Sequence, residues 1–122
     1  MKKYFIFILT ILLTFLSINA IAETNYLTIL TFGEYGNRAG EFNYPAGIAI
    51  DRDNNLYISD WENDRIQKFS SEGRLLKVIP EGEGEDALKL DGPVGLALDS
   101  NGNIIIVEQF NHRIHKISPE GK

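Results

Sequence analysis

Beyond residue 22, apolar and polar residues alternate over short runs, which is the pattern of β-strands. In the first half the runs are Gly47–Asp51, Leu56–Asp60, Arg65–Phe69 and Leu75–Ile79. Asp, Asn and Gly separate these runs, and such residues bond to their own backbone or accept left-handed angles in turns. No stretch has the i, i+3, i+4, i+7 spacing of an amphipathic helix. The sequence therefore predicts an all-β fold built from four-stranded antiparallel meanders.

The pattern occurs twice along the chain. Residues 45–74 align without a gap to residues 93–122, so that Pro45 is equivalent to Pro93, and 13 of the 30 aligned pairs are identical. Many of the other pairs exchange like for like, as Ile48 does for Leu96. Self-similarity at this period, in segments that read as strands, predicts a propeller or another repeat array.

The first strand of each repeat has one face made only of Gly and Ala. Residues 47–50 read Gly-Ile-Ala-Ile, and residues 95–98 repeat the same alternation of small and large side chains. A small face suits a strand close to a central axis, where neighbouring sheets converge. Apolar side chains on the opposite faces of the repeat, including Trp61 and Phe110, predict a neighbouring sheet on each side.

Both copies resemble an NHL repeat. Residues 43–51 read Asn-Tyr-Pro-Ala-Gly-Ile-Ala-Ile-Asp, residues 63–66 read Asn-Asp-Arg-Ile, and residues 111–114 read Asn-His-Arg-Ile. The resemblance implies β-propeller blades of four antiparallel strands, and proteins of this family usually close a ring of about six blades.

The chain is short for such a ring. The repeats at 45–79 and 93–122 supply four and three strands, and Tyr26–Thr31 supplies one more, so about two blades are expected in a domain over 23–122. The favoured interpretation is a truncated or split reading frame, because long single-chain rings are commoner than trimeric rings of short repeats. The alternative is self-association through unpaired blade edges, with three copies closing a six-blade ring by exchanging the first strand.

Residues 1–22 have the composition of a secretory signal peptide. Lys2 and Lys3 precede an uncharged apolar run, and residues 20–22 supply the small side chains that a signal peptidase reads. We expect cleavage before Glu23 and a secreted or periplasmic protein. The alternative is a membrane anchor over residues 4–22, whose length is close to the ~20 residues that span a bilayer.

Charge and cysteine content narrow the class of partner. Without Lys2 and Lys3 the chain has 10 basic and 17 acidic side chains, a net charge of −7. Some intracellular relatives of the resembled family bind RNA through a basic face, whereas this charge repels phosphate backbones, so no nucleic-acid partner is expected. Because cysteine is absent, stability must come from packing alone.

Two groups of residues invite a metal-site interpretation. Residues 51–55 read Asp-x-Asp-x-Asn and Glu62 stands at the twelfth place, as in a calcium loop, but Leu56 replaces the required glycine, so a turn is expected. His112 and His115 are three positions apart on a strand and point to opposite faces, so they cannot easily share one ion. We expect no cofactor and no metal ion.

An acidic residue and an arginine recur at the same hairpin of both repeats. Catalytic residues are normally unique in a chain, so this recurrence favours a structural role in holding the turn. The structural repeat residues are Asp60, Asn63, Arg65, Glu108, Asn111 and Arg113.

An enzyme is the less favoured function class. Similarity to peptidyl-hydroxyglycine lyases implies zinc-binding histidines directly after the blade proline, but Ala46 and Val94 occupy those positions. Serine-nucleophile motifs, phosphate loops and cysteine clusters are also missing. A propeller enzyme therefore requires site residues in missing blades.

The favoured function is a non-catalytic binding or interaction module with a protein or glycan ligand. Contacts are expected in the segments between blades, at 32–44 and 80–92, and at the tip of the second hairpin. The alternatives are solvated connectors and packing of Trp61 on the adjacent blade. The candidate ligand contacts are Tyr35, Arg38, Phe42, Tyr44 and Trp61.

Overall fold

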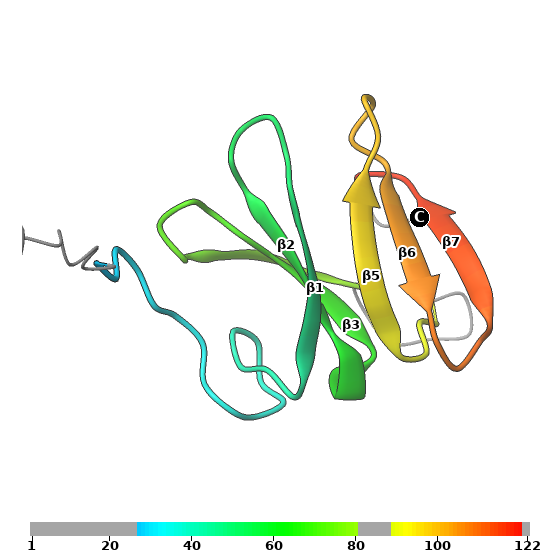
Figure 1. Cartoon of the computed structure of the whole chain (residues 1–122), viewed down its shortest axis with the longest axis horizontal. Coiled ribbons are helices and arrows are strands. Elements are labelled where there is room, and N and C mark those ends of the chain that lie inside the picture. The colour runs from blue at the N-terminus through cyan, green and yellow to red at the C-terminus, as the bar shows by residue number, and fades with distance from the viewer. Residues whose placement is uncertain (1–26, 81–88, 121–122) are drawn as a thin grey trace, which may run out of the picture.

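The computed structural model describes residues 27–80 and 89–120, so the expected signal peptide lies outside the described residues (Figure 1). Within them, seven strands form two antiparallel sheets that stand side by side. The prediction of an all-β fold is confirmed. The strands are β1 (Pro45–Ile50), β2 (Leu56–Asp60), β3 (Arg65–Phe69), β4 (Leu75–Ile79), β5 (Pro93–Leu98), β6 (Ile104–Glu108) and β7 (Arg113–Ile117).

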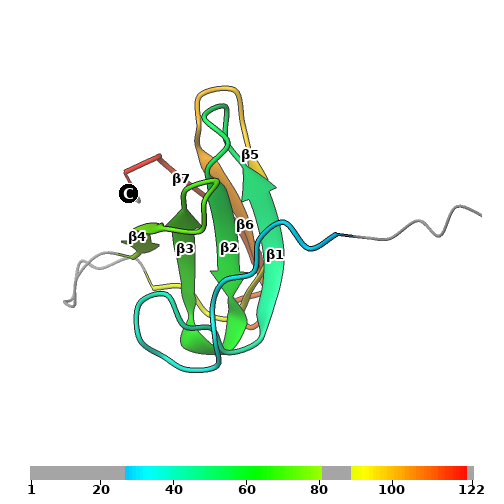
Figure 2. The same cartoon turned by 90° about the vertical axis from the view of Figure 1, so that its left-hand side faces the viewer.

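The first sheet is the expected four-stranded meander, in the order β1-β2-β3-β4 (Figure 2). Its β1 begins at Pro45 rather than at the predicted start, Gly47, because Pro45 also pairs with Asp60 across an irregularity in the register. A single turn of 3-10 helix (Trp61–Asn63) connects β2 to β3. No helix among the described residues is long and apolar enough to cross a bilayer.

The second sheet has the order β5-β6-β7. A fourth strand does not lie beside β7 within the described residues. Residues 27–31, for which the sequence predicts a strand together with Tyr26, form no strand in the described part of that range. The prediction fails there because these residues run away from both sheets, with no sheet edge beside them (Figure 1).

The turn between the first two strands is built identically in both sheets. Asp51 Oδ1 accepts hydrogen bonds from the backbone N–H of Asp53 (3.0 Å) and Asn55 (2.8 Å). Asp99 Oδ1 does the same for the backbone N–H groups of Asn101 and Asn103 (2.9 Å each). The aspartate therefore closes each turn, as the composition of these loops predicts.

The hydrophobic core lies between the two sheets. Its buried members come from both, and they are Tyr57, Ile66, Ile79, Leu90, Ile104, Ile106 and Ile117. At Gly47 the strands β1 and β5 approach so closely that a Cβ atom would lie 2.2 Å from the Val94 carbonyl oxygen. Ser59 Oγ accepts from the Gly47 N–H (2.7 Å) and donates to the same carbonyl (3.1 Å). The small face of β1 thus sits where the sheets crowd together, as expected.

Candidate binding surface

A fully buried carboxylate, Asp60, holds together the end of the first sheet where β2 turns into β3, which is the lower end in Figure 1. Its Oδ2 accepts hydrogen bonds from Arg65 Nε (2.7 Å), Asn63 Nδ2 (2.8 Å) and Gln67 Nε2 (3.3 Å). Its Oδ1 accepts from the backbone N–H of Asn43 (2.7 Å). The predicted structural residues of the first repeat therefore meet around one carboxylate.

Arg65 also ties the preceding loop to the sheet. Its guanidinium donates to the backbone carbonyls of Asn37 (2.8 Å), Arg38 (2.7 Å) and Glu41 (2.8 Å). Gln67 adds a hydrogen bond from Nε2 to the Glu41 carbonyl (2.7 Å). The charge-assisted bonds from Arg65 hold the 33–44 segment as a rigid platform below β1.

Glu108 plays the same part in the second sheet. It accepts from Arg113 Nε (2.9 Å) and Asn111 Nδ2 (2.5 Å), and it lies 2.8 Å from His115 Nδ1. Burial raises the pKa of Glu108, but the hydrogen bonds from Arg113, Asn111 and His115 outweigh burial and lower it. His115 thus belongs to this network, a role that the sequence reasoning missed. The signal was its alignment with Gln67 of the first repeat.

The metal-site candidates are dispersed. Asp51 precedes β2 and Glu62 follows it, so these two carboxylates lie at opposite ends of one strand. Lys68 Nζ instead forms an ion pair with Asp51 Oδ2 (3.0 Å). Within residues 27–80 and 89–120, no three His, Asp or Glu side chains come together as a metal site requires.

An aromatic row, formed by Tyr44, Trp61 and Phe110, crosses the boundary between the sheets at their lower end. Trp61 meets Tyr44 edge-on, with ring centroids 5.9 Å apart, and stacks on Phe110 at 5.6 Å. Tyr44 is 68 % exposed and Phe110 is 53 % exposed. Trp61 therefore packs on the adjacent sheet and also supports two solvent-facing rings.

The backbone at Tyr44 is held in an unusual conformation. Tyr44 has φ of 54°, and its equivalent in the second repeat, Gly92, has φ of 58°. Glycine adopts this left-handed region freely, whereas a tyrosine there costs on the order of 1–2 kcal/mol. A Cβ atom at Gly92 would lie 2.6 Å from the Phe110 ring, so a larger residue there would displace this ring. The first repeat carries an exposed tyrosine instead, and strain of this kind is typical of functional positions.

A groove of about 530 Å³ adjoins the aromatic row and brings together three predicted contacts, Tyr35, Phe42 and Tyr44. Tyr35 is 83 % exposed, whereas Phe42 is buried and packs on Phe69 with centroids 5.6 Å apart. Phe42 is therefore the floor of the groove, and the tyrosines are its rim.

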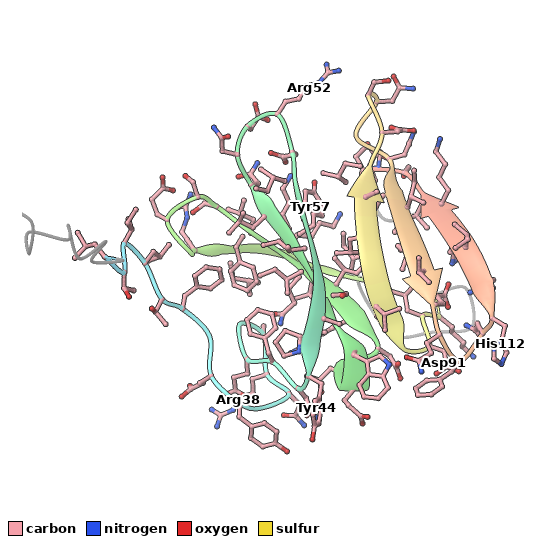
Figure 3. All side chains as sticks on the ribbon, viewed as in Figure 1. Arg38, Tyr44, Arg52, Tyr57, Asp91 and His112 are labelled. Carbon is pink, nitrogen blue, oxygen red and sulfur yellow. The ribbon has the colours of Figure 1, made fainter. Side chains whose placement is uncertain are left out.

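Arg38 does not line this groove. It lies at the same end of the molecule as Tyr44 (Figure 3), and its 86 % exposed side chain forms an ion pair with Glu41 (3.3 Å). The sequence predicts for Phe110 only a contact with a neighbouring sheet. Its place in the row became visible only once the two sheets were placed relative to each other.

Comparison with known proteins identifies the repeats. The NHL repeat family model matches residues 42–69 and 90–117, which contain β1–β3 and β5–β7. The chain is an NHL-repeat protein. Each match also includes a buried apolar residue ahead of the first strand, Phe42 or Leu90, in this NHL-repeat protein.

Curated relatives of this NHL-repeat protein match it over one stretch. Protein brain tumor of Drosophila melanogaster is 44 % identical over 43 residues, and the B-box type zinc finger protein ncl-1 of Caenorhabditis elegans is 42 % identical over 43. Protein lin-41 of Caenorhabditis elegans is 38 % identical over 48 residues. These stretches cover 35 %, 35 % and 39 % of this chain, and 4 %, 5 % and 4 % of the respective relatives.

Solved structures show the same fold. A streptogramin B lyase superposes with a TM-score of 0.54 at 21 % identity, over 75 % of this chain and 27 % of the other. A catalytically inactive virginiamycin B lyase from Staphylococcus aureus, with quinupristin, gives 0.50 at 19 % identity, over 64 % and 25 %. The two sheets of this NHL-repeat protein are β-propeller blades, called below the first blade (β1–β4) and the second blade (β5–β7). At these identities the likeness concerns the fold alone.

Proposed function

We propose that this NHL-repeat protein is a non-catalytic binding module that works outside the cytoplasm and holds a protein ligand on its aromatic row. The observation that carries the proposal is the row itself. Tyr44 and Phe110 are more than half exposed, and both rest on Trp61, Tyr44 within the first blade and Phe110 across the blade boundary. Large aromatic side chains of this kind dominate the binding energy of protein interfaces.

The row is supported by a rigid base. The Asp60 and Glu108 networks fix the two hairpins that carry Trp61 and Phe110. Backbone hydrogen bonds from the Trp61 N–H to the Tyr44 carbonyl (3.2 Å), and from the Gln109 N–H to the Gly92 carbonyl (2.9 Å), add to this support. A ligand that docks here therefore orders few side chains, and the entropic cost of binding is small.

The charge around the row favours a polypeptide that carries basic side chains. Glu34 lines the adjoining groove, and Glu62 follows Trp61 directly; both are exposed. With the net charge of −7 after removal of the leader, this surface attracts Lys or Arg and repels phosphate. The N-terminal segment, with its signal-like composition, supports an extracytoplasmic location.

The test uses peptides selected from a random phage-displayed library against the purified protein. Trp61 is the only tryptophan in the chain, so its fluorescence reports occupancy of the row directly. We expect selected peptides to contain basic residues, to shift the Trp61 emission, and to lose at least about tenfold in affinity with the Tyr44→Ala variant.

The matched control is Arg52→Ala, at the opposite end of the first blade (Figure 3), which should bind the same peptides as wild type. Selected peptides that bind Tyr44→Ala and wild type equally would overturn the proposal. Failure to select any peptide would also overturn the proposal. Binding to an array of glycans in that case would not rescue it, because the proposed ligand is a protein.

A further inference from the structure

We propose that copies of this chain assemble head to tail into a closed ring of blades. In this assembly, residues 27–31 of one copy form the fourth strand of the second blade of the next. The inference does not depend on the proposed function, because it rests on other residues.

Each blade has a rear face, which carries Ser59 and Ile66 in the first blade, and Val107 and Ile114 in the second. The rear face of the first blade is covered by the second blade, whereas the rear face of the second blade is exposed. Ser59 and Ile66 pair across β2 and β3, and both are fully buried at the boundary between blades. Their equivalents Val107 and Ile114 pair in the same way across β6 and β7, but they are 40 % and 66 % exposed. An isoleucine stands at both positions 66 and 114, so the difference in burial comes from the missing neighbour.

The front faces, which carry the large side chains of β1 and β5, show the opposite pattern: that of the second blade is covered and that of the first is exposed. Leu96 and Leu98 on β5 pack against the core between the blades. Their equivalents on β1, Ile48 and Ile50, are each 60 % exposed. One chain therefore presents an open front and an open rear that match the two sides of its own internal boundary.

A second copy is the partner that fits both faces. Its front face can cover Val107 and Ile114 in the arrangement with which the second blade covers the first, with an apolar contact at Val107 in place of the hydrogen bond from Ser59 to the Val94 carbonyl. Such a head-to-tail contact is heterologous, and it closes into a ring when the rotation between neighbours permits. Two open apolar faces of this kind are otherwise a liability for aggregation.

A segment equivalent to the fourth strand of a blade lies at the start of the described residues. In the repeat alignment that places Pro93 on Pro45, moving β4 (Leu75–Ile79) back by one repeat gives residues 27–31. There Leu27 and Ile29 are 84 % and 94 % exposed, and in an extended strand their side chains point to the same face. The outer edge of β7 has no partner strand within the described residues.

The segment cannot serve β7 of its own chain. Phe32 anchors it on the first blade by packing against Phe69, with centroids 4.9 Å apart. Figure 1 shows the segment leaving from the side of the first blade that is remote from β7. In the proposed ring this segment therefore pairs with β7 of another copy, which is a form of β-strand addition.

The boundary between the two blades of one chain also indicates that the aromatic row stays accessible in the ring. Phe110 lies at the occupied boundary and still exposes 53 % of its surface. The lower ends of the blades, which carry the aromatic row, thus remain open in the assembly. Since propellers contain about four to eight blades, a ring of two-blade chains holds about two to four copies.

The repeat fixes the register of the new pairing. In the first blade, Ile66 pairs with Ile79 and Lys68 with Lys77. In the proposed pairing, β7 takes the place of β3, so Ile66 and Lys68 are replaced by their equivalents one repeat later. Residues 27–31 take the place of β4, so Ile79 and Lys77 are replaced by their equivalents one repeat earlier. The result pairs Ile114 with Thr31, and Lys116 with Ile29, of the neighbouring copy.

The first experiment measures the mass of the full chain as purified, with its leader processed by the host, by light scattering at micromolar concentration. We expect two to four times the mass of one chain. Ile114→Glu should give single chains with an unchanged β-sheet circular dichroism spectrum, since this side chain is exposed within the chain. Ser100→Glu, which adds the same charge at an exposed loop, should leave the assembly intact. A monodisperse wild-type monomer or an indefinite aggregate overturns the proposal.

The second experiment tests the register. The chain has no cysteine, so every disulfide in the double variant Thr31→Cys/Ile114→Cys is engineered. Residues directly opposite in a sheet lie within reach of a disulfide, whereas diagonal ones do not. Oxidation should link copies covalently in this variant and not in the control Thr31→Cys/Lys116→Cys. Equal linkage in both variants, or linkage in neither, contradicts the strand exchange.

Discussion

At the scale of single residues, the two blades enclose the same ion pair to different degrees. The Arg65 side chain beside Asp60 is 12 % exposed, whereas the Arg113 side chain beside Glu108 is 47 % exposed. If Arg113 is removed, water can solvate the Glu108 carboxylate, whereas removal of Arg65 leaves the Asp60 carboxylate buried without a cation. The equivalent positions therefore differ in their contribution to stability.

We predict that Arg65→Ala lowers the free energy of unfolding by about 3–5 kcal/mol, because it leaves the buried Asp60 carboxylate without its cation and removes three hydrogen bonds to backbone carbonyls. Arg113→Ala should cost only about 1–2 kcal/mol, since this arginine side chain is 47 % exposed and water can take its place beside Glu108. Urea denaturation of both variants measures the difference. Equal losses would show that burial does not set the energy of this pair.

The Asp51 carboxylate makes stability depend on pH. Burial raises its pKa, but hydrogen bonds from Asn55 and the contact with Lys68 outweigh burial and lower the pKa to about 2. The unfolded value is about 3.9. A lowered pKa in the folded state means that the stabilisation is complete above the unfolded value and is lost as the pH falls towards 2.

We therefore predict that Asp51→Asn, which keeps the turn-forming oxygen, lowers the free energy of unfolding by about 1 kcal/mol at pH 7. The gap to wild type should narrow as the pH is lowered from 5 to 3. Denaturation curves across this range measure it, with Asp53→Asn as the control in the same loop. A gap that widens on acidification would refute the sign of the effect.

At the scale of elements, strand positions follow from local sequence because alternation and turn chemistry are local. The ends of β2, β3 and β4 agree with the prediction residue for residue. The start of β1 does not, because Pro45 reaches its partner Asp60 only across an irregular register that alternation cannot reveal. The predicted strand at 26–31 fails for a similar reason, since a strand requires a neighbouring edge as well as a pattern.

Contacts between elements were harder to predict. The stacking of Trp61 on Phe110, and the burial of Phe42 beneath the groove, depend on how one sheet is placed against the other. The sequence identified Tyr35 and Tyr44 as candidate contacts because they are aromatic residues in the segment that precedes the first blade. Only the structure distinguishes them from Arg38, which lies apart, and their role as ligand contacts stays a prediction.

The approach of β1 to β5 gives a prediction for these two elements. Gly47→Ala should lower the free energy of unfolding by about 1–3 kcal/mol, because the new Cβ meets a backbone carbonyl at 2.2 Å that can move only with its strand. Gly95→Ala is the matched control, and both changes are made in the Ile114→Glu variant, in which no neighbouring copy covers Val107. The new Cβ at position 95 would lie 3.0 Å from the exposed Val107 side chain, which can rotate away, so we expect a smaller loss by urea denaturation.

A loss at Gly95 equal to that at Gly47 would contradict this account of the boundary. It would indicate that the general cost of replacing glycine in these strands, rather than crowding between sheets, decides the effect.

At the scale of the whole molecule, the proposed ring links stability to protein concentration. Anything that binds only the folded state stabilises it by mass action, and here the bound species is another copy. For a three-copy ring, a tenfold rise in concentration should raise the melting midpoint by about 4 °C. Scanning calorimetry at two concentrations measures the shift, and Ile114→Glu should abolish it. A midpoint independent of concentration in the wild type would argue against assembly.

The recurrence of the blade sequence at a fixed spacing has a consequence for how such proteins evolve. Every unit carries both a front and a rear that fit any other unit, so tandem duplication of the coding segment yields a compatible neighbour in one step. No new complementary surface has to arise by separate mutations. Lineages can thus lengthen or shorten the gene by whole units, and selection can then diversify the exposed rims independently.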